Sequence, residues 1–228
     1  MLVNPHLPEG IKLTNNRHPT MKTDTFSINL KEISCGDCQL ELDFGSFTLP
    51  YNASYIGAEP LSTLIEAAHA LQTDYEPIDD LDESEAVQKT RSYEIIWMDE
   101  PGYLRLSCSI PAGSSDLTIK IAQNFEDFYG VDDKKANEKQ RETITMPQKL
   151  FFDAVINAAL KALKKYGICG FHNNWNGNWD LGAETLPLQT LLQLLGADQN
   201  LKEVENENGL KSNIFEELEL LQTALKQA

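Results

Sequence analysis

Four residues of the sequence have the types and spacings of metal ligands. Cys35 and Cys38 form a C-x-x-C pair, and Cys169 and His172 form a C-x-x-H pair. Thiolates and an imidazole can bind one zinc ion with tetrahedral geometry, and a tight turn can bring both members of each pair to the metal. One interpretation is therefore a Cys₃His zinc site, with no other cofactor implied. In the alternative interpretation, Cys35 and Cys38 flank a turn and Cys169 packs beneath it.

The segment over residues 172–180 is rich in asparagine and contains two tryptophans. Trp175 and Trp179 are four residues apart, and an indole can stack on a sugar or on a peptide side chain. Aromatic residues also dominate the hot spots of protein interfaces, so both tryptophans are candidate binding residues. In the alternative interpretation, both indoles cover the core beside a helix expected at 151–166.

A run of acidic residues forms a third candidate site. Between residues 74 and 85 there are seven acidic residues and no basic one. Like charges at this density repel one another, and together with Pro77 they predict a solvated loop. Clustered charge attracts partners of the opposite sign, although it also increases solubility. The candidate binding residues in this loop are Asp79, Asp80, Asp82 and Glu83.

The charge of the whole chain limits its partners. The 228 residues include 35 acidic and 19 basic ones, which gives a formal net charge of −16 and a pI near 4.6. Nucleic acids and anionic membranes are bound through basic patches, so we expect neither partner. No stretch approaches the roughly 18 apolar residues of a membrane span. The start of the sequence lacks a secretory pattern and cysteines are few, so we expect a cytoplasmic protein.

The elements that must position these residues fall into strands and helices. Alternating apolar residues predict a hairpin over residues 25–33 and 39–49. Further alternation predicts a three-stranded antiparallel meander whose strands begin near Tyr93, Tyr103 and Leu117.

Helical spacing of apolar residues predicts helices over 60–72 and 147–166. Glu59 and Pro60 suit the start of the first helix, and Gly167 suits the end of the second. Basic residues in the last part of the second helix complement its dipole: Lys161, Lys164 and Lys165. Shorter helices are expected over residues 186–195 and 213–227.

This order of elements favours an α+β fold, in which an antiparallel sheet of about five strands, the hairpin plus the meander, has helices packed on one face. We expect a flexible leader over residues 1–24 and a single α+β domain over 25–196. A charged linker and a C-terminal amphipathic helix are expected over 197–228. That helix either docks on the domain or joins a second copy into a homodimer.

Three short stretches carry a resemblance to other proteins. They are residues 54–61 (SYIGAEPL), residues 97–103 (WMDEPGY) and the pair Tyr166-Gly167. Over residues 50–195 the sequence resembles uncharacterised bacterial proteins, some of which are similar to immunity partners of secreted toxins. The resemblance implies a bacterial cytoplasmic protein with an immunity role. Because the shared stretches are structural turns, the resemblance implies no functional residue.

These observations favour a non-catalytic binding protein, such as an inhibitor of a basic effector protein. The acidic loop would attract the partner and the two tryptophans would bind it. The alternatives are a zinc-binding protein that uses the Cys₃His set, and an enzyme whose site is assembled from scattered polar residues. Catalytic motifs such as G-x-S-x-G and H-E-x-x-H do not occur, so no catalytic residue is assigned.

Overall fold

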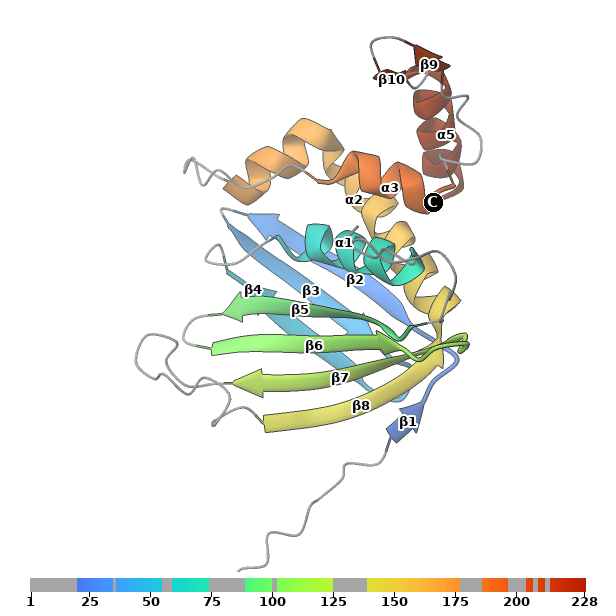
Figure 1. Ribbon diagram of the computed structural model, residues 1–228. Coiled ribbons are helices and arrows are strands. Elements are labelled where there is room, and N and C mark those ends of the chain that lie inside the picture. Colours follow the sequence, from blue (N-terminus) through green and yellow to red (C-terminus); the bar gives the residue numbers. More distant parts are fainter. Residues whose placement is uncertain are drawn as a thin grey trace, which may run out of the picture.

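The computed structural model has an α+β architecture with two β-sheets and helices packed against them (Figure 1). This confirms the expected fold class, but the strands form two sheets instead of a single antiparallel one. The structure describes residues 20–34, 36–54, 59–73, 89–99, 102–124, 139–176, 186–196, 204–206, 209–211 and 214–228. Within these ranges, no helix combines the length and the apolar character that a membrane crossing requires.

The smaller sheet extends the predicted hairpin by a third strand. Its antiparallel strands are, in order, β2 (Ser27–Ser34), β3 (Asp37–Asp43) and β4 (Thr48–Ala53). The chain reverses between β3 and β4 at Gly45, whose positive φ of 76° suits glycine. The N–H of Gly45 donates to the carboxylate of Asp43 at 2.8 Å. The strand expected over 39–49 therefore ends at this turn.

The larger sheet contains the predicted meander and two more strands. The meander consists of β5 (Arg91–Asp99), β6 (Gly102–Ile110) and β7 (Asp116–Asn124). The added strands are β8 (Lys139–Pro147), antiparallel to β7, and β1 (Thr20–Lys22), parallel to β8. The sheet order is β1-β8-β7-β6-β5, so this sheet is mixed and not purely antiparallel. The strand β1 lies in the segment expected to be a leader.

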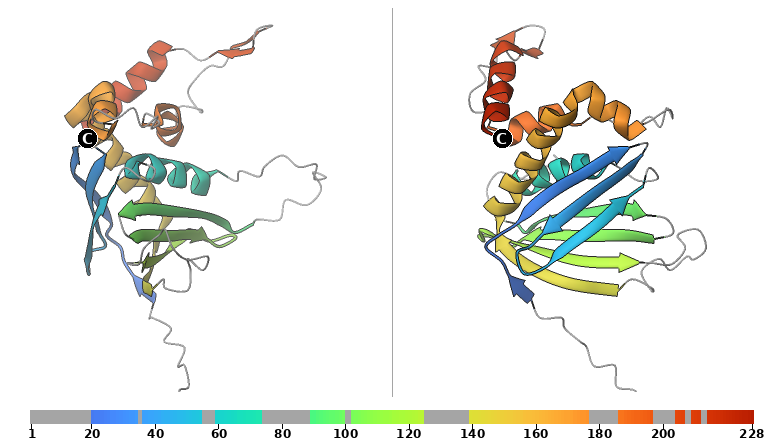
Figure 2. Two further views of the ribbon diagram at one scale, coloured as in Figure 1. Left: turned by 90° about the vertical axis from the view of Figure 1, so that its left-hand side faces the viewer. Right: turned by 180° about the vertical axis from the view of Figure 1, so that it is seen from behind.

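The two sheets face each other across the core, and one edge of each meets the other (Figure 2). Ser54, directly after β4, donates its N–H to the carbonyl of Met98 in β5 at 2.7 Å. The hydroxyl of Tyr51 donates to the carbonyl of Trp97 at 2.8 Å. Side chains from both sheets and from the helices form one core. Its largest fully buried members include Trp97, Trp175, Phe44, Phe151 and Phe171.

Two helices pack on the sheets, and each contacts a different strand. The helix α1 (Pro60–Gln72) has the predicted bounds and packs on β5. The helix α2 (Gln148–Asn176) runs along β2 and contacts α1. The indole N–H of Trp97 donates to the hydroxyl of Thr63 at 2.8 Å and so joins α1 to the larger sheet. The helices thus contact both sheets, whereas the sequence predicted packing on one face of a single sheet.

The helix α2 is longer than the sequence predicted. Gly167 interrupts its helical geometry with φ of 68° and ψ of 176°, a conformation that side chains rarely adopt. The chain then resumes a helical path as far as Asn176. Gly167 therefore ends the first helical stretch, as predicted, and a second stretch follows it across a kink. Residues 171–176, expected as a loop, belong to this second stretch and are helical.

The C-terminal part of the chain contacts the rest of the fold through two helices, of which the first packs on α1 and α2 and the second packs on α2. Its elements are α3 (Leu188–Leu194), β9 (Val204–Asn206), β10 (Gly209–Lys211) and α5 (Ile214–Gln227). The two short strands form a hairpin where a charged linker was expected, and α5 confirms the predicted terminal helix. Leu221 and Leu225 of α5 pack against the core. Phe215 and Leu218 near its start are 77% and 46% exposed.

Candidate functional site

The predicted zinc ligands lie in different parts of the structure. Cys38 in β3 is completely buried, Cys169 is exposed on α2, and His172 is half-buried three residues further on. Cys35 lies outside the described residues. Within the described part of the chain, no group of three or more His, Cys, Asp or Glu side chains could hold a metal ion. The structure therefore does not bring Cys38 together with Cys169 and His172.

The environment of Cys38 opposes formation of a thiolate. Desolvation in the core raises the pKa of its thiol far above the ordinary value, and the negative charge of the buried Glu59 raises it further. Cys108 in β6 is also buried, and desolvation raises its pKa to about 12. Both thiols are therefore protonated at neutral pH and pack as small apolar groups.

Trp175 belongs to the core. Its side chain is 2% exposed on the last part of α2 and joins the cluster that includes Phe171. This position matches the alternative interpretation, in which the indole covers the core. The other predicted binding residues lie outside the described residues: Trp179, Asp79, Asp80, Asp82 and Glu83. Their binding role stays a prediction.

A buried carboxylate caps the first helix. Glu59 is 5% exposed, and its oxygens accept hydrogen bonds from the N–H of Leu61 at 2.8 Å and from the N–H of Ser62 at 2.7 Å. The hydroxyl of Ser62 donates to the same carboxylate at 2.7 Å. Desolvation raises the pKa of Glu59, although these hydrogen bonds oppose the rise. The sequence predicted the helix start, but the burial depends on tertiary packing.

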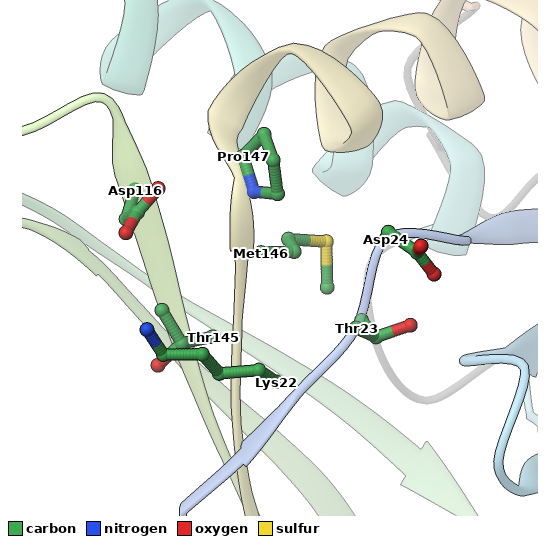
Figure 3. Close-up of a pocket in the computed structure, with 7 residues that line it drawn as sticks. All are labelled: Lys22, Thr23, Asp24, Asp116, Thr145, Met146 and Pro147. Carbon is green, nitrogen blue, oxygen red and sulfur yellow. The ribbon is translucent and has the colours of Figure 1, made fainter.

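A hollow of about 470 Å³ lies where β1 meets the end of β8 (Figure 3). Its lining residues are Lys22, Thr23, Asp24, Asp116, Thr145, Met146 and Pro147. The N–H of Thr23 donates to the carbonyl of Thr145 at 3.0 Å, and the hydroxyl of Thr23 donates to the carbonyl of Phe44 at 2.8 Å. These bonds fix the wall of the hollow to both sheets.

Charges of both signs surround this hollow. In Figure 3 the ammonium of Lys22 lies on the side of Asp116 and Thr145, whereas Asp24 lies on the other side of Met146. Two carboxylates, one ammonium and two hydroxyls can bind a small polar group or a cationic side chain through charge-assisted hydrogen bonds. Sequence reasoning missed this site because β1 lies in the expected leader and pairs with a strand distant in sequence.

A second hollow, of about 350 Å³, forms a groove between β2 and α2, which lie side by side in Figure 2. Its lining residues are Ile28, Asn29, Leu30, Lys31, Ala158, Lys161, Ala162, Lys165 and Tyr166. Ile28, Ala158 and Ala162 are buried and form an apolar floor. The three lysines are exposed. Lys161 and Lys165 on α2 give this side of the groove positive charge, whereas the ammonium of Lys31 is paired with the carboxylate of Glu41 at 3.3 Å. We call this feature the lysine groove.

Comparison with known proteins gives no relative from which a function could be transferred. No family model matches the sequence, and no curated protein and no solved structure is significantly similar to it. The resemblance to immunity partners of secreted toxins therefore stays a prediction.

Proposed function

We propose that the protein is a non-catalytic binding protein that inhibits a basic effector protein, as bacterial immunity proteins do. The observation that carries this proposal is the distribution of charge along the chain. The chain has 35 acidic and 19 basic residues. The positions that the structure describes hold 16 of the acidic and 14 of the basic residues, and the remaining positions hold 19 acidic and 5 basic residues. The described fold therefore has a formal charge of −2, and the other segments carry −14.

The segment over residues 74–88 holds half of that excess, with seven acidic residues and no basic one. Its two ends join described elements that pack on each other. Thr73 donates its N–H and its hydroxyl to the carbonyl of His69 at 3.0 and 2.9 Å. On the other side, the guanidinium of Arg91 donates to the carbonyl of Gln72 at 3.2 Å. The described residues that flank the acidic segment therefore lie close together, where α1 meets β5.

The hollow beside β1 supports a basic partner as well. Two carboxylates, Asp24 and Asp116, and one ammonium, that of Lys22, line a space of about 470 Å³, so its formal charge is negative and its size is large enough for a lysine or arginine side chain of a partner. Complementary charge of this kind raises association rates and selects partners by sign. The negative charge of the chain disfavours nucleic acid and anionic membranes as partners. The proposed location is the cytoplasm.

A charge-neutralised variant tests the proposal. The triple variant Asp79→Asn, Asp80→Asn, Asp82→Asn and the wild type are immobilised and exposed to lysate of the native host, and captured proteins are identified by mass spectrometry. We expect the wild type to capture a basic protein, to inhibit its activity on mixing, and to release it at high salt. The triple variant should bind that protein at least about tenfold more weakly.

The matched control carries the same change in net charge elsewhere. Glu216→Gln, Glu217→Gln, Glu219→Gln removes three charges from α5, and we expect it to bind the partner as the wild type does. Equal loss of binding in both variants would show that only overall charge matters. A partner that is acidic, or that keeps its activity in the complex, would contradict the proposed function.

A further inference from the structure

The lysine groove has the features of a site for an extended acidic peptide. We propose that such a segment of a partner protein lies in the lysine groove along the junction of β2 and α2, adds a strand to the edge of β2, and pairs its carboxylates with Lys161 and Lys165. This ligand has the opposite charge to the basic effector proposed above. The two proposals therefore succeed or fail independently.

The edge of β2 supplies the backbone partners. Among the described strands, β2 pairs with β3 alone, and α2 lies on its other side. The pairing with β3 shifts register between Leu30 and Glu32, at Lys31. The carbonyl of Lys31 accepts a hydrogen bond from the ammonium of Lys165 at 3.2 Å, so it is directed toward α2. An incoming strand would donate an amide to this carbonyl in place of Lys165, as in strand addition at a sheet edge, and the released ammonium would pair with a carboxylate of the peptide.

Lys161 supplies charge that the helix dipole does not need, whereas Lys165 lies within the last turn before Gly167. Lys161 and Lys165 are one helical turn apart, and like charges at this spacing disfavour a helix. The dipole at a helix end favours cations only within the last turn, and Lys161 lies more than one turn before Gly167. The ammonium of Lys165 is held 4.6 Å from the ring centre of Tyr166. An acidic ligand would offset the repulsion and meet a lysine that is already positioned.

The floor of the groove fits the other face of a strand. Ala158 and Ala162 are 2% exposed, and their small side chains leave space next to the buried Ile28. Successive side chains of a strand point to opposite sides, so a peptide with alternating acidic and apolar residues could direct one set to the lysines and the other to this floor. The volume of about 350 Å³ suits a short segment and not a folded domain.

A labelled peptide tests the proposal on the full-length protein. The probe is a fluorescein-labelled octapeptide of four Glu-Val repeats, measured by fluorescence anisotropy at physiological ionic strength, with four Lys-Val repeats as the comparison peptide. We expect the wild type to bind the Glu-Val peptide and not the Lys-Val peptide. The variant Lys161→Gln, Lys165→Gln should bind it roughly five- to tenfold more weakly, because two exposed charge pairs are lost.

The control variant is Lys120→Gln, Lys149→Gln, which makes the same change in charge at exposed positions outside the groove. It should bind the Glu-Val peptide within about twofold of the wild type. Addition of the peptide should also shift the backbone amide NMR signals of residues 28–31. Equal weakening in both variants, or binding of both peptides, would overturn the proposal. Signal shifts of the same size with free glutamate would overturn it as well.

Discussion

Glu59 is a carboxylate in a place where negative charge is unfavourable. Desolvation raises its pKa in the folded protein, and its hydrogen bonds from Leu61 and Ser62 offset only part of the rise. In the unfolded chain the pKa of a glutamate side chain is about 4.3. Between these two pKa values the folded protein binds more protons than the unfolded one. Its free energy of unfolding therefore falls as the pH rises through this interval.

We expect Glu59→Gln to remove this dependence. The free energy of unfolding of the wild type minus that of the variant should decrease as the pH rises above 4.5, until the pH passes the pKa of Glu59 in the folded protein, with a slope of at most about 1.4 kcal/mol per pH unit. Urea unfolding at a series of pH values gives this difference. Glu219→Gln, which removes a carboxylate from an exposed position of α5, serves as the control. Parallel curves for the wild type and Glu59→Gln would contradict the prediction.

Residue type and spacing predicted the start of a helix at Glu59 and Pro60, but they did not predict the burial of Cys38. The pair Glu59 and Pro60 predicted a helix start, because capping is local chemistry. The spacing of Cys38 to the other candidate ligands suggested zinc, yet Cys38 alternates with Leu40 and Leu42 on the buried side of β3. That alternation was present in the sequence and favours a core position. Spacing within each pair says nothing about the distance between the pairs.

At the scale of elements, the strands missed by the sequence are those stabilised by neighbours. The strand β4 contains Pro50, and a proline within a segment argues locally against a strand because it lacks an N–H. Pro50 is exposed and β4 pairs with β3 alone in its sheet, so a proline without an N–H is tolerated there. The short strand β1 depends on its parallel pairing with β8. Local patterns carry no information about such pairings.

The lysine groove could not be predicted for the same reason. Lys161 and Lys165 were assigned to the end of a helix, which is a local interpretation. The groove exists only because α2 lies along β2, and the bond between Lys165 and Lys31 joins residues 134 positions apart. Sequence reasoning can thus provide the side chains of a site and their helical spacing, whereas the opposing wall depends on the fold.

The junction of α1 with the larger sheet gives a second stability prediction. The buried indole N–H of Trp97 in β5 donates to the hydroxyl of Thr63 at 2.8 Å, and that hydroxyl donates to the carbonyl of Pro60 at 2.8 Å. Thr63→Val preserves the shape but leaves the indole N–H without its acceptor. We expect a loss of about 1–3 kcal/mol in the free energy of unfolding, measured with urea.

The control for this junction is Thr223→Val. The hydroxyl of Thr223 donates to the carbonyl of Glu219 at 2.8 Å on the exposed side of α5. Its loss should change the free energy of unfolding by no more than about 0.5 kcal/mol. If Thr63→Val changes it as little, the hydrogen bond to Trp97 does not hold α1 on the sheet.

At the scale of the whole molecule, the net charge of −16 describes two unlike parts. The described fold is nearly neutral, with a formal charge of −2, and the rest of the chain is strongly acidic. The fold can therefore present a basic groove between β2 and α2 while the chain as a whole repels anions. The two proposed interactions, with a basic effector and with an acidic strand, use these parts separately. Bulk charge alone would have predicted only the first.

The terminal helix predicts how whole molecules associate. Leu221 and Leu225 continue the apolar stripe of α5 onto the core, whereas Phe215 and Leu218 at its start remain 77% and 46% exposed. We expect two copies to pair through antiparallel α5 helices, because this arrangement buries both residues about a two-fold axis. It also places the acidic first turn of one copy, which contains Glu216 and Glu217, beside Lys226 of the other.

Sedimentation equilibrium over a range of protein concentrations measures this association. We expect Phe215→Ser to weaken the dimer at least about tenfold, because the loss of a buried aromatic anchor typically costs about 2 kcal/mol or more of binding free energy. The control is Ile96→Ser, which removes an apolar side chain that is 43% exposed on β5, far along the chain from α5. This control should associate as the wild type does. A wild type that stays monomeric at every concentration, or equal weakening by both substitutions, would show that α5 does not form the contact. In that case the exposed start of α5 would have no role in self-association, and the apolar stripe would serve only to dock its second half on α2 and α3.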